Sequence, residues 1–287
     1  MSRDWSKSAI TVYSPDTILS GLAPALGTFI VNATGLQHES AFLAIHDESS
    51  IDRFYKLQRR SADSQQAALV RDLFVSRPLI VTTWRGPDAL LRLQNIKGAT
   101  QPALAQAGSI RSLFWCDNPV CNLIHVSDDI ENMERDYGIL LDRRVAELRK
   151  NRARQDKYLL SPSMARHNAL LEFRRVLSRN VLCTTATKLH TSLAQDGNAC
   201  CTALAIIRDL IRDVQAGPAV AKVLTNSFLF AQRDFYAASK KYLGPCSAWE
   251  RLVIHCGIAS NRLWVDRLCQ SQSDKWLVEY LMDSAHV

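Results

Sequence analysis

The sequence predicts a chain of two parts, in which a region of mixed strands and helices is followed by an all-helical region. Over residues 1–140, short apolar runs rich in β-branched residues, such as SAITVY and PLIVTTW, alternate with helix-like stretches. This alternation indicates an α/β or α+β architecture. After about residue 140 such runs disappear and apolar residues recur every three or four positions, which is the spacing of a helix with one buried face. The 287 residues are also sufficient for two domains.

Four runs of the first region are expected to be buried strands, because they are short, apolar and rich in β-branched residues. They are SAITVY, SAFLAIH, PLIVTTW and NLIHVS. The helices expected in this region are ILSGLAPALGTFIVNA, SSIDRFYKL and SQQAALVRDLFV. In the second region Gly- or Pro-containing breaks, such as SPS and LGPC, separate about six predicted helices.

The composition excludes several classes of protein. No run of about 20 apolar residues is present, so no membrane span is expected. The start, MSRDWSKSAITVY, lacks the apolar core of a secretory signal. The eight cysteines form no C-x-x-C pairs and no His lies at zinc-finger spacing, so we expect no metal site and reduced thiols in an intracellular protein.

The positive charge of the chain is concentrated in one segment. Residues 141–180 contain eleven Lys or Arg against four acidic residues, an excess that equals the net charge of +7 of the whole chain. We therefore expect a domain at 1–140, a basic helical connector at 141–160 and an all-α domain at 161–287. The basic segment either binds an acidic surface, such as RNA phosphates or acidic tails like those of tubulin, or is a solvated connector.

The strongest chemical motif lies around His125. Arg111 precedes a strand that carries Asn122 and His125, and Ser127 and an acidic helix follow. Neutral imidazole is nucleophilic near pH 7, so a histidine at the end of a strand can accept a phosphoryl group, which a nearby hydroxyl positions. An upstream arginine would neutralise phosphate charge.

This motif resembles the signature of the nucleoside diphosphate kinase family, a strand of the form N-x-I/V-H-x-S-D. The segment from Trp84 to Phe114, WRGPDALLRLQNIKGATQPALAQAGSIRSLF, is similar without a gap to the family's stretch from W-E-G through G-x-T-N-P to P-G-T-I-R-G-D-F. Near the start, VYSPDTILSGLAPAL resembles the family's I-K-P-D-x-x-x-x-G-L. The resemblance covers roughly residues 8–140.

The resemblance implies a fold, a reaction and a set of site residues. The fold would be α+β, a four-stranded antiparallel ferredoxin-like sheet with helices on one face, and the reaction a ping-pong transfer in which a histidine takes the γ-phosphate of one nucleotide and gives it to another. Mg²⁺ would accompany the nucleotide. The implied catalytic residues are His125, Ser127 and Asp136, and the implied nucleotide-binding residues are Tyr55, Thr100, Arg111 and Asn122.

Several positions depart from the family pattern. Ser14 replaces the Lys of K-P-D, and Gln94 stands where a phosphate-binding Arg is expected. The aromatic residue that stacks on the base has no clear counterpart in RRSADSQQ, Val126 replaces the Gly after the histidine, and Leu113 replaces the Asp of G-D-F. Each lost charge-assisted contact to a transferring phosphate costs on the order of 10²–10³ in rate.

These departures favour a degenerate module that acts as a structural or nucleotide-binding component of a larger intracellular assembly with protein partners. The family resemblance suggests the cytoplasm, and within it the axoneme of a cilium or flagellum. Two alternatives are an active nucleoside diphosphate kinase that phosphorylates His125 and an RNA-associated component of an organellar ribosome that uses residues 141–180.

Overall fold

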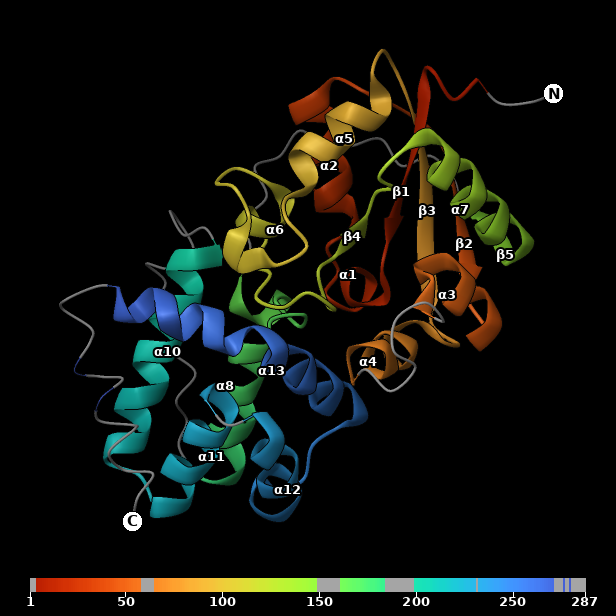
Figure 1. The fold of residues 1–287 in the computed structure, drawn as a ribbon. Coiled ribbons are helices and arrows are strands. Elements are labelled where there is room, and N and C mark those ends of the chain that lie inside the picture. The colour runs from red at the N-terminus through yellow and green to blue at the C-terminus, as the bar shows by residue number, and fades with distance from the viewer. Residues whose placement is uncertain are drawn as a thin grey trace. The chain divides into compact units, whose positions relative to one another are not determined.

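The chain divides into two compact units (Figure 1). The computed structural model describes residues 4–57, 65–148, 161–183, 199–230, 232–270, 276 and 279. Unit 1 comprises Met1–Ala99, Gly108–Arg111 and Val120–Leu159, and unit 2 comprises Thr100–Ala107, Ser112–Pro119 and Leu160–Val287. Two short segments before residue 120 therefore belong to the helical unit. The domain boundaries expected at residues 140 and 160 stay predictions.

Unit 1 is built on an antiparallel sheet with the strand order β4-β1-β3-β2-β5. The strands are β1 (Ser8–Tyr13), β2 (Gln37–Ile45), β3 (Pro78–Arg85), β4 (Ile124–His125) and β5 (Arg144–Leu148). The first four follow the ferredoxin-like order, with β1 and β3 in the centre. The predicted α+β class is therefore confirmed, and β5 adds a fifth strand to the four that were expected.

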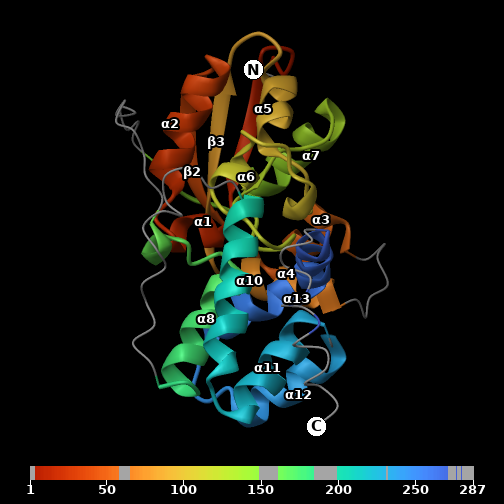
Figure 2. The same ribbon diagram turned by 90° about the vertical axis from the view of Figure 1, so that its left-hand side faces the viewer.

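Helices cover both faces of this sheet rather than one. The helices of this region are α1 (Pro15–Leu19), α2 (Ala23–Thr34), α3 (Glu48–Tyr55), α4 (Gln65–Phe74), α5 (Ala89–Lys97), α6 (Ile110–Leu113) and α7 (Ile130–Asp142). Figures 1 and 2 place α2 and α5 on one side of the sheet and α7 on the other. All six residues of β1 are buried, which requires cover on both faces because alternate side chains of a strand point to opposite sides.

Two capping residues fix where the helices around the site begin. Asp47 precedes α3, and its carboxylate accepts a hydrogen bond from the backbone N–H of Ser50 at 2.8 Å. Asp129 precedes α7 and accepts from the N–H of Asn132 at 2.7 Å. An acceptor at this position satisfies a backbone N–H that the helix leaves without a partner. These caps set the start of the two helices that carry Tyr55 and Asp136.

The expectation of a helical connector over residues 141–160 is wrong for its first part. Helix α7 continues to Asp142, and Arg144–Leu148 then form β5, which pairs antiparallel with β2. This pairing joins residues about a hundred positions apart, such as Leu43 and Ala146, so local helix propensity does not reveal it. Residues 149–160 lie outside the described part of the chain.

Unit 2 is helical, as predicted. In its described residues it contains α8 (Ala169–Asn180), α10 (Ala199–Gln215), α11 (Ala219–Leu229), α12 (Gln232–Tyr242), α13 (Ala248–Cys269) and two short 3-10 helices, Pro102–Leu104 and Pro162–Met164. The rings of Phe173, Phe228 and Phe235 form its aromatic centre, with the first two stacked at 4.1 Å between centroids. No helix in the described parts of either unit is long and apolar enough to cross a membrane.

A buried carboxylate ties the segment Ser112–Pro119 into unit 2. Asp117 is 1% exposed, and its carboxylate accepts hydrogen bonds from the backbone N–H of Ala169 at 3.0 Å and of Leu170 at 2.7 Å, at the start of α8. Its carbonyl oxygen accepts from Ser260 Oγ and Trp264 Nε1, both at 2.7 Å. One residue thus joins this segment to α8 and α13 through polar groups that are shielded from water.

We expect Gly257→Ala to destabilise unit 2, although alanine favours a helix. A Cβ at Gly257 would lie 2.4 Å from the Cβ of Ala169, so α8 and α13 would have to move apart. Such overpacking costs about 1–3 kcal/mol, against a gain of at most about 1 kcal/mol from helix propensity. The loss is measured as a lower midpoint of thermal unfolding. The double variant with Ala169→Gly should recover much of it, and additive effects of the two substitutions would contradict this account.

Candidate functional site

His125 lies on the edge strand of the unit 1 sheet, next to two aromatic rings. Its backbone is paired with Val12 of β1, and its side chain is 23% exposed. The ring centroid lies 4.8 Å from that of Phe54 and 5.7 Å from that of Tyr55, at the end of α3. The imidazole is therefore held between the sheet and α3 while part of it remains open to solvent.

Asp136 of α7 sets the orientation of the His125 ring. One oxygen of the carboxylate, Oδ2, lies 3.2 Å from His125 Nε2 and accepts a hydrogen bond from Ser127 Oγ at 2.8 Å. An ionised carboxylate can only accept hydrogen bonds, so Nε2 must carry the proton. The neutral imidazole then has its lone pair on Nδ1, the nitrogen that would act as the nucleophile.

The protein keeps this carboxylate ionised. Burial alone raises the pKa of Asp136, but the hydrogen bonds that it accepts outweigh burial and hold the pKa below its ordinary value. Arg135 contributes through its Nη2, 2.6 Å from Asp136 Oδ1. The same guanidinium donates to Asn132 Oδ1 at 2.7 Å, so it is itself held in place on α7. Arg135 was not among the residues predicted from the sequence.

The backbone just before His125 is held in an unfavourable conformation. Leu123 has a φ of 72°, a value that costs a non-glycine residue about 1–3 kcal/mol. Its N–H donates to the buried Asp16 carboxylate at 3.0 Å. Its carbonyl accepts from the N–H of Ser14 at 3.1 Å and from the Thr17 hydroxyl. The turn that begins α1 therefore fixes Leu123, between Asn122 and His125. Ser14 itself is 3% exposed.

We expect Asp16→Asn to remove a pH dependence of stability. Burial raises the pKa of Asp16 to about 6 from 3.8, so the unfolded chain releases this proton at lower pH than the folded chain. Stability therefore falls as pH rises from about 4 to about 6, by about 3 kcal/mol for a shift of this size. Asparagine can still accept from the N–H of Leu123 but cannot ionise.

The measurement is urea unfolding of both proteins at about pH 4 and about pH 8. The free energy of unfolding of the Asp16→Asn protein, minus that of the parent, should be larger at about pH 8 than at about pH 4. The contributions of all other titrating groups cancel in this difference. An exposed acid, Asp72→Asn, is the control and should give the same difference at both pH values. An equal difference at both pH values for Asp16→Asn would contradict the buried carboxylate as its source.

Arg111 supports the strand of His125 from its outer edge. Its side chain donates to the carbonyls of Gly98 at 2.8 Å, Asn122 at 3.3 Å and Ile124 at 2.9 Å, and the residue is 4% exposed. Three of its N–H directions therefore point at backbone carbonyls. The guanidinium lies next to the predicted site, but much of its hydrogen-bonding capacity serves the fold.

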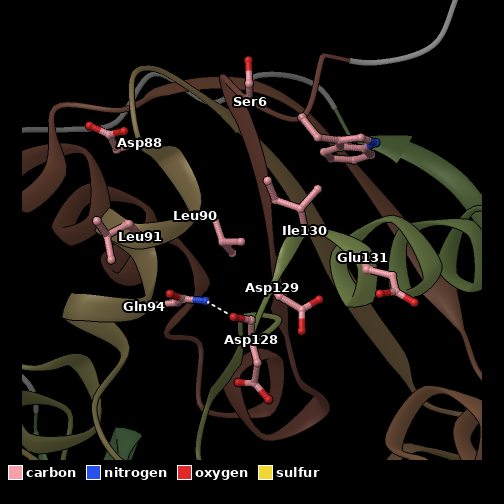
Figure 3. Close-up of a pocket in the computed structure, with 10 residues that line it drawn as sticks. Ser6, Asp88, Leu90, Leu91, Gln94, Asp128, Asp129, Ile130 and Glu131 are labelled. Carbon is pink, nitrogen blue, oxygen red and sulfur yellow. Dashed lines mark hydrogen bonds between the residues drawn. The ribbon is translucent and has the colours of Figure 1, made fainter.

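Gln94 and Lys97 of α5 hold the backbone that follows His125. The Gln94 amide donates to the carbonyl of Ser127 at 2.9 Å. It also donates to the carbonyl of Asp128 at 2.8 Å (Figure 3). Lys97 Nζ donates to the carbonyl of Val126 at 3.0 Å. Burial lowers the pKa of Lys97, and the neighbouring Arg111 lowers it further. Gln94 occupies the position of an expected phosphate-binding Arg, yet here its amide is committed to the backbone.

The structure brings four of the predicted site residues together. His125, Ser127, Asp136 and Tyr55 form one cluster in unit 1 by direct contact. Asn122 lies three residues before His125 in the same unit, whereas Thr100 is exposed and belongs to unit 2. The described residues contain no group of three or more His, Cys, Asp or Glu side chains able to hold a metal ion.

Sequence reasoning missed several supporting residues. Phe54, Arg135 and Lys97 contact the site, and Asp16 and Thr17 support it through Leu123. Lys97 alone carried a usable signal, since it follows Gln94 by three positions and so lies on the same face of a helix. The fit of the others depends on which elements pack together.

Comparison with known proteins gives a consistent assignment for this unit. The family model for nucleoside diphosphate kinase matches residues 10–145. A nucleoside diphosphate kinase of Ehrlichia chaffeensis is 28% identical over 131 residues, which are 45% of this chain and 88% of that relative. One of Symbiobacterium thermophilum is 38% identical over 68 residues, and the chain spans only 45% of the length of that relative.

A solved structure to which this chain is similar shows a likeness of fold alone. The structure of a halophilic nucleoside diphosphate kinase from Halobacterium salinarum in complex with CDP is 24% identical, with a TM-score of 0.42, and the match covers 49% of this chain and 91% of that one. The motif around His125, the ferredoxin-like strand order and the family model coincide on the same residues. Residues 10–145 of this chain thus form a domain of the nucleoside diphosphate kinase family.

Proposed function

We propose that this protein is a degenerate nucleoside diphosphate kinase-like module that binds nucleotide and transfers phosphate weakly or not at all. The observation that carries the proposal is the amide of Gln94, which donates to the carbonyls of Ser127 and Asp128. A cation is expected at this position to neutralise phosphate charge. Ser14, at the position of a second expected cation, is buried and uncharged. The transferring phosphoryl group would therefore lack two sources of electrostatic stabilisation.

The alternative is an active nucleoside diphosphate kinase, and one observation favours it. The contact of His125 Nε2 with Asp136 leaves Nδ1 as the nucleophilic nitrogen, so the first requirement of a covalent phosphate transfer is met. In that reaction Nδ1 attacks the γ-phosphorus of a nucleoside triphosphate, the bond to the bridging oxygen breaks, and the diphosphate leaves. The two proposals differ in the stabilisation of the transition state, not in the nucleophile.

The nucleotide is expected to bring its own metal ion. Mg²⁺ prefers oxygen ligands and usually binds through substrate phosphates with only one or two carboxylates from the protein. When bound, Mg²⁺ would offset phosphate charge, while the residues of the chain position the nucleotide and the His125 ring.

The test combines binding with covalent labelling of the full-length chain. Calorimetric titration with a nucleoside diphosphate and Mg²⁺ should detect binding that Tyr55→Ala or Asn122→Ala weakens. Incubation with γ-labelled ATP should give little acid-labile, base-stable label. Rapid stoichiometric labelling that His125→Ala abolishes would establish the active enzyme instead. Absence of nucleotide binding would contradict both proposals for this domain.

We further propose that the module belongs to a larger intracellular assembly, in the cytoplasm or in the axoneme of a cilium or flagellum. This part of the proposal rests on the second unit, which the family's catalytic chemistry does not require. Its test is purification of the tagged full-length protein from its source cells. Stoichiometric co-purification with defined proteins supports it, and recovery of the chain alone contradicts it.

The RNA-binding alternative loses much of its basis in the described residues. Between residues 141 and 180, each described Lys or Arg pairs with a carboxylate of the chain: Arg143, Arg144, Arg166, Arg174, Arg175 and Arg179. Five further basic residues of this segment lie outside the described residues. Paired arginines release few counterions, so we expect these six arginines to contribute little to the salt dependence of any RNA affinity.

A further inference from the structure

A concave site lies in unit 1, beside the backbone that follows His125. It is a cavity of about 570 Å³, within the range of about 300–1,000 Å³ typical of ligand sites. Its walls are the start of α5, residues 128–131 before and at the start of α7, and Trp5 (Figure 3). The Trp5 ring is fixed against Tyr137 of α7, with centroids 5.1 Å apart. Of the positions discussed above for phosphate transfer, Gln94 lines this cavity, whereas His125, Ser127 and Asp136 do not.

The charge of this cavity is strongly negative. Four carboxylates line it, those of Asp88, Asp128, Asp129 and Glu131, and no Lys or Arg does. Two helices begin here, since Asp88 and Asp129 precede α5 and α7, and each helix start supplies about half a positive charge. Lys97 Nζ lies 3.8 Å from Asp128 Oδ1. This ion pair is weak, because the Asp128 side chain is 90% exposed to solvent. The four carboxylates and the two helix starts together leave about three negative charges at the cavity.

Large apolar side chains lie between these carboxylates. Leu91 is 56% exposed and Ile130 is 46% exposed, and Leu90 lies with them along the cavity. Figure 3 shows Leu90 and Ile130 between Asp88 and Glu131. Apolar side chains rimmed by charges mark surfaces that another molecule covers. The whole chain has a net charge of +7, so the charge of this acidic rim is opposite in sign to that of the chain.

From this combination we propose that the cavity is a docking site for a basic segment of a partner protein, in which Arg or Lys side chains alternate with aliphatic ones. The carboxylates of Asp88, Asp128 and Glu131 would pair with the basic groups. Leu91 and Ile130 would be covered by the aliphatic groups. A small amine would match the charge but would leave both of these apolar side chains exposed, which is why a peptide segment fits better.

The site adjoins the reactive centre through one residue. Gln94 lines the cavity and donates to the carbonyls of Ser127 and Asp128. Ser127 in turn donates to Asp136, the carboxylate that orients His125. An occupant that draws the Asp128 side chain toward itself would therefore act on the backbone next to the histidine. Docking itself does not require phosphate transfer, and its test is independent of that reaction.

The experiment measures binding of a labelled peptide to the full-length chain by fluorescence anisotropy. The probe is a twelve-residue amidated peptide of alternating arginine and leucine. The triple variant Asp88→Asn, Asp128→Asn, Glu131→Gln should bind it about tenfold more weakly, since exposed charge pairs each contribute modestly. The matched control Asp72→Asn, Glu134→Gln, Asp142→Asn removes the same charge from exposed positions of unit 1 and should change the affinity less than about twofold.

Three further arms decide the nature of the occupant. Peptides in which serine replaces leucine, or glutamate replaces arginine, should bind about tenfold more weakly or not at all. The variant Leu91→Ser, Ile130→Ser should weaken binding of the leucine peptide but not of the serine peptide. If the triple variant of the cavity and the matched control lose the same peptide affinity, the effect comes from overall charge alone, and the proposal is overturned. The proposal is also overturned if spermidine displaces the labelled peptide as well as unlabelled peptide does. It is overturned as well if the chain self-associates and only the triple variant of the cavity abolishes this self-association.

Discussion

Restoring two cations, Ser14→Lys together with Gln94→Arg, should raise the rate of phosphohistidine formation at His125 by at least about a hundredfold. One preorganised donor to a developing negative charge is worth about 10²–10³ in rate, and both positions now carry neutral side chains. The nucleophile needs no change, because Asp136 already fixes the tautomer of His125. The measurement is single-turnover labelling with γ-labelled ATP, with His125→Ala as the background.

Matched controls separate charge from size in this experiment. Ser14→Met and Gln94→Met introduce long side chains without charge and should leave the rate unchanged or lower it. The buried position of Ser14 makes a folding check by circular dichroism necessary for each variant. A restored pair that folds and still labels no faster would show that the arginine has only replaced the Gln94 amide on the carbonyls of Ser127 and Asp128.

Asp117→Ala should destabilise unit 2 by about 3–5 kcal/mol, the largest stability effect that we expect. The substitution leaves the N–H groups of Ala169 and Leu170 buried without their acceptor, and it also removes one of the two acceptors of Asn118 Nδ2. Each buried unsatisfied group costs about 1–3 kcal/mol. For a unit of this size the loss corresponds to a fall in the midpoint of thermal unfolding of about 10 °C, followed by the helical circular dichroism signal.

An exposed acid provides the control for this prediction. Asp266 pairs with Arg262 one turn away on α13 at 2.8 Å, and its side chain is 48% exposed. Asp266→Ala should therefore cost only about 0.3–0.5 kcal/mol. Asp117→Asn retains one acceptor and should fall between the two. If Asp117→Ala and Asp266→Ala lower the midpoint equally, the segment Ser112–Pro119 does not depend on the carboxylate for its place in unit 2.

The sequence was sufficient for the fold class but not for the borders of the fold. Runs such as SAITVY and PLIVTTW became β1 and β3 because their β-branched residues fill both sides of a central strand. In contrast, RVAEL lies in a basic, helix-prone stretch and became β5 because the edge of β2 was available for pairing. Such an edge exists only after the sheet has formed, so local propensity could not predict it.

The bonding of the candidate site could not be predicted from the sequence. The family resemblance pointed to His125 and Asp136, and the structure shows how one carboxylate contacts both the histidine and Ser127. No spacing rule could indicate that Gln94 and Arg111 donate to backbone carbonyls. Those bonds depend on how the loops approach α5 in three dimensions. Substitutions at such positions therefore mislead when they are judged by residue type alone.

Strand β5 also has a consequence for solubility. Without it the nine-residue β2 would form the outer edge of the sheet and would expose a row of unpaired N–H and C=O groups that a strand of another molecule can pair with. The strand that covers part of this edge has only five residues and carries Arg144 and Glu147, both largely exposed and paired with each other at 2.8 Å. A short, charged outer strand is a poor template for sheet extension, so this part of the sheet is protected against edge-to-edge aggregation.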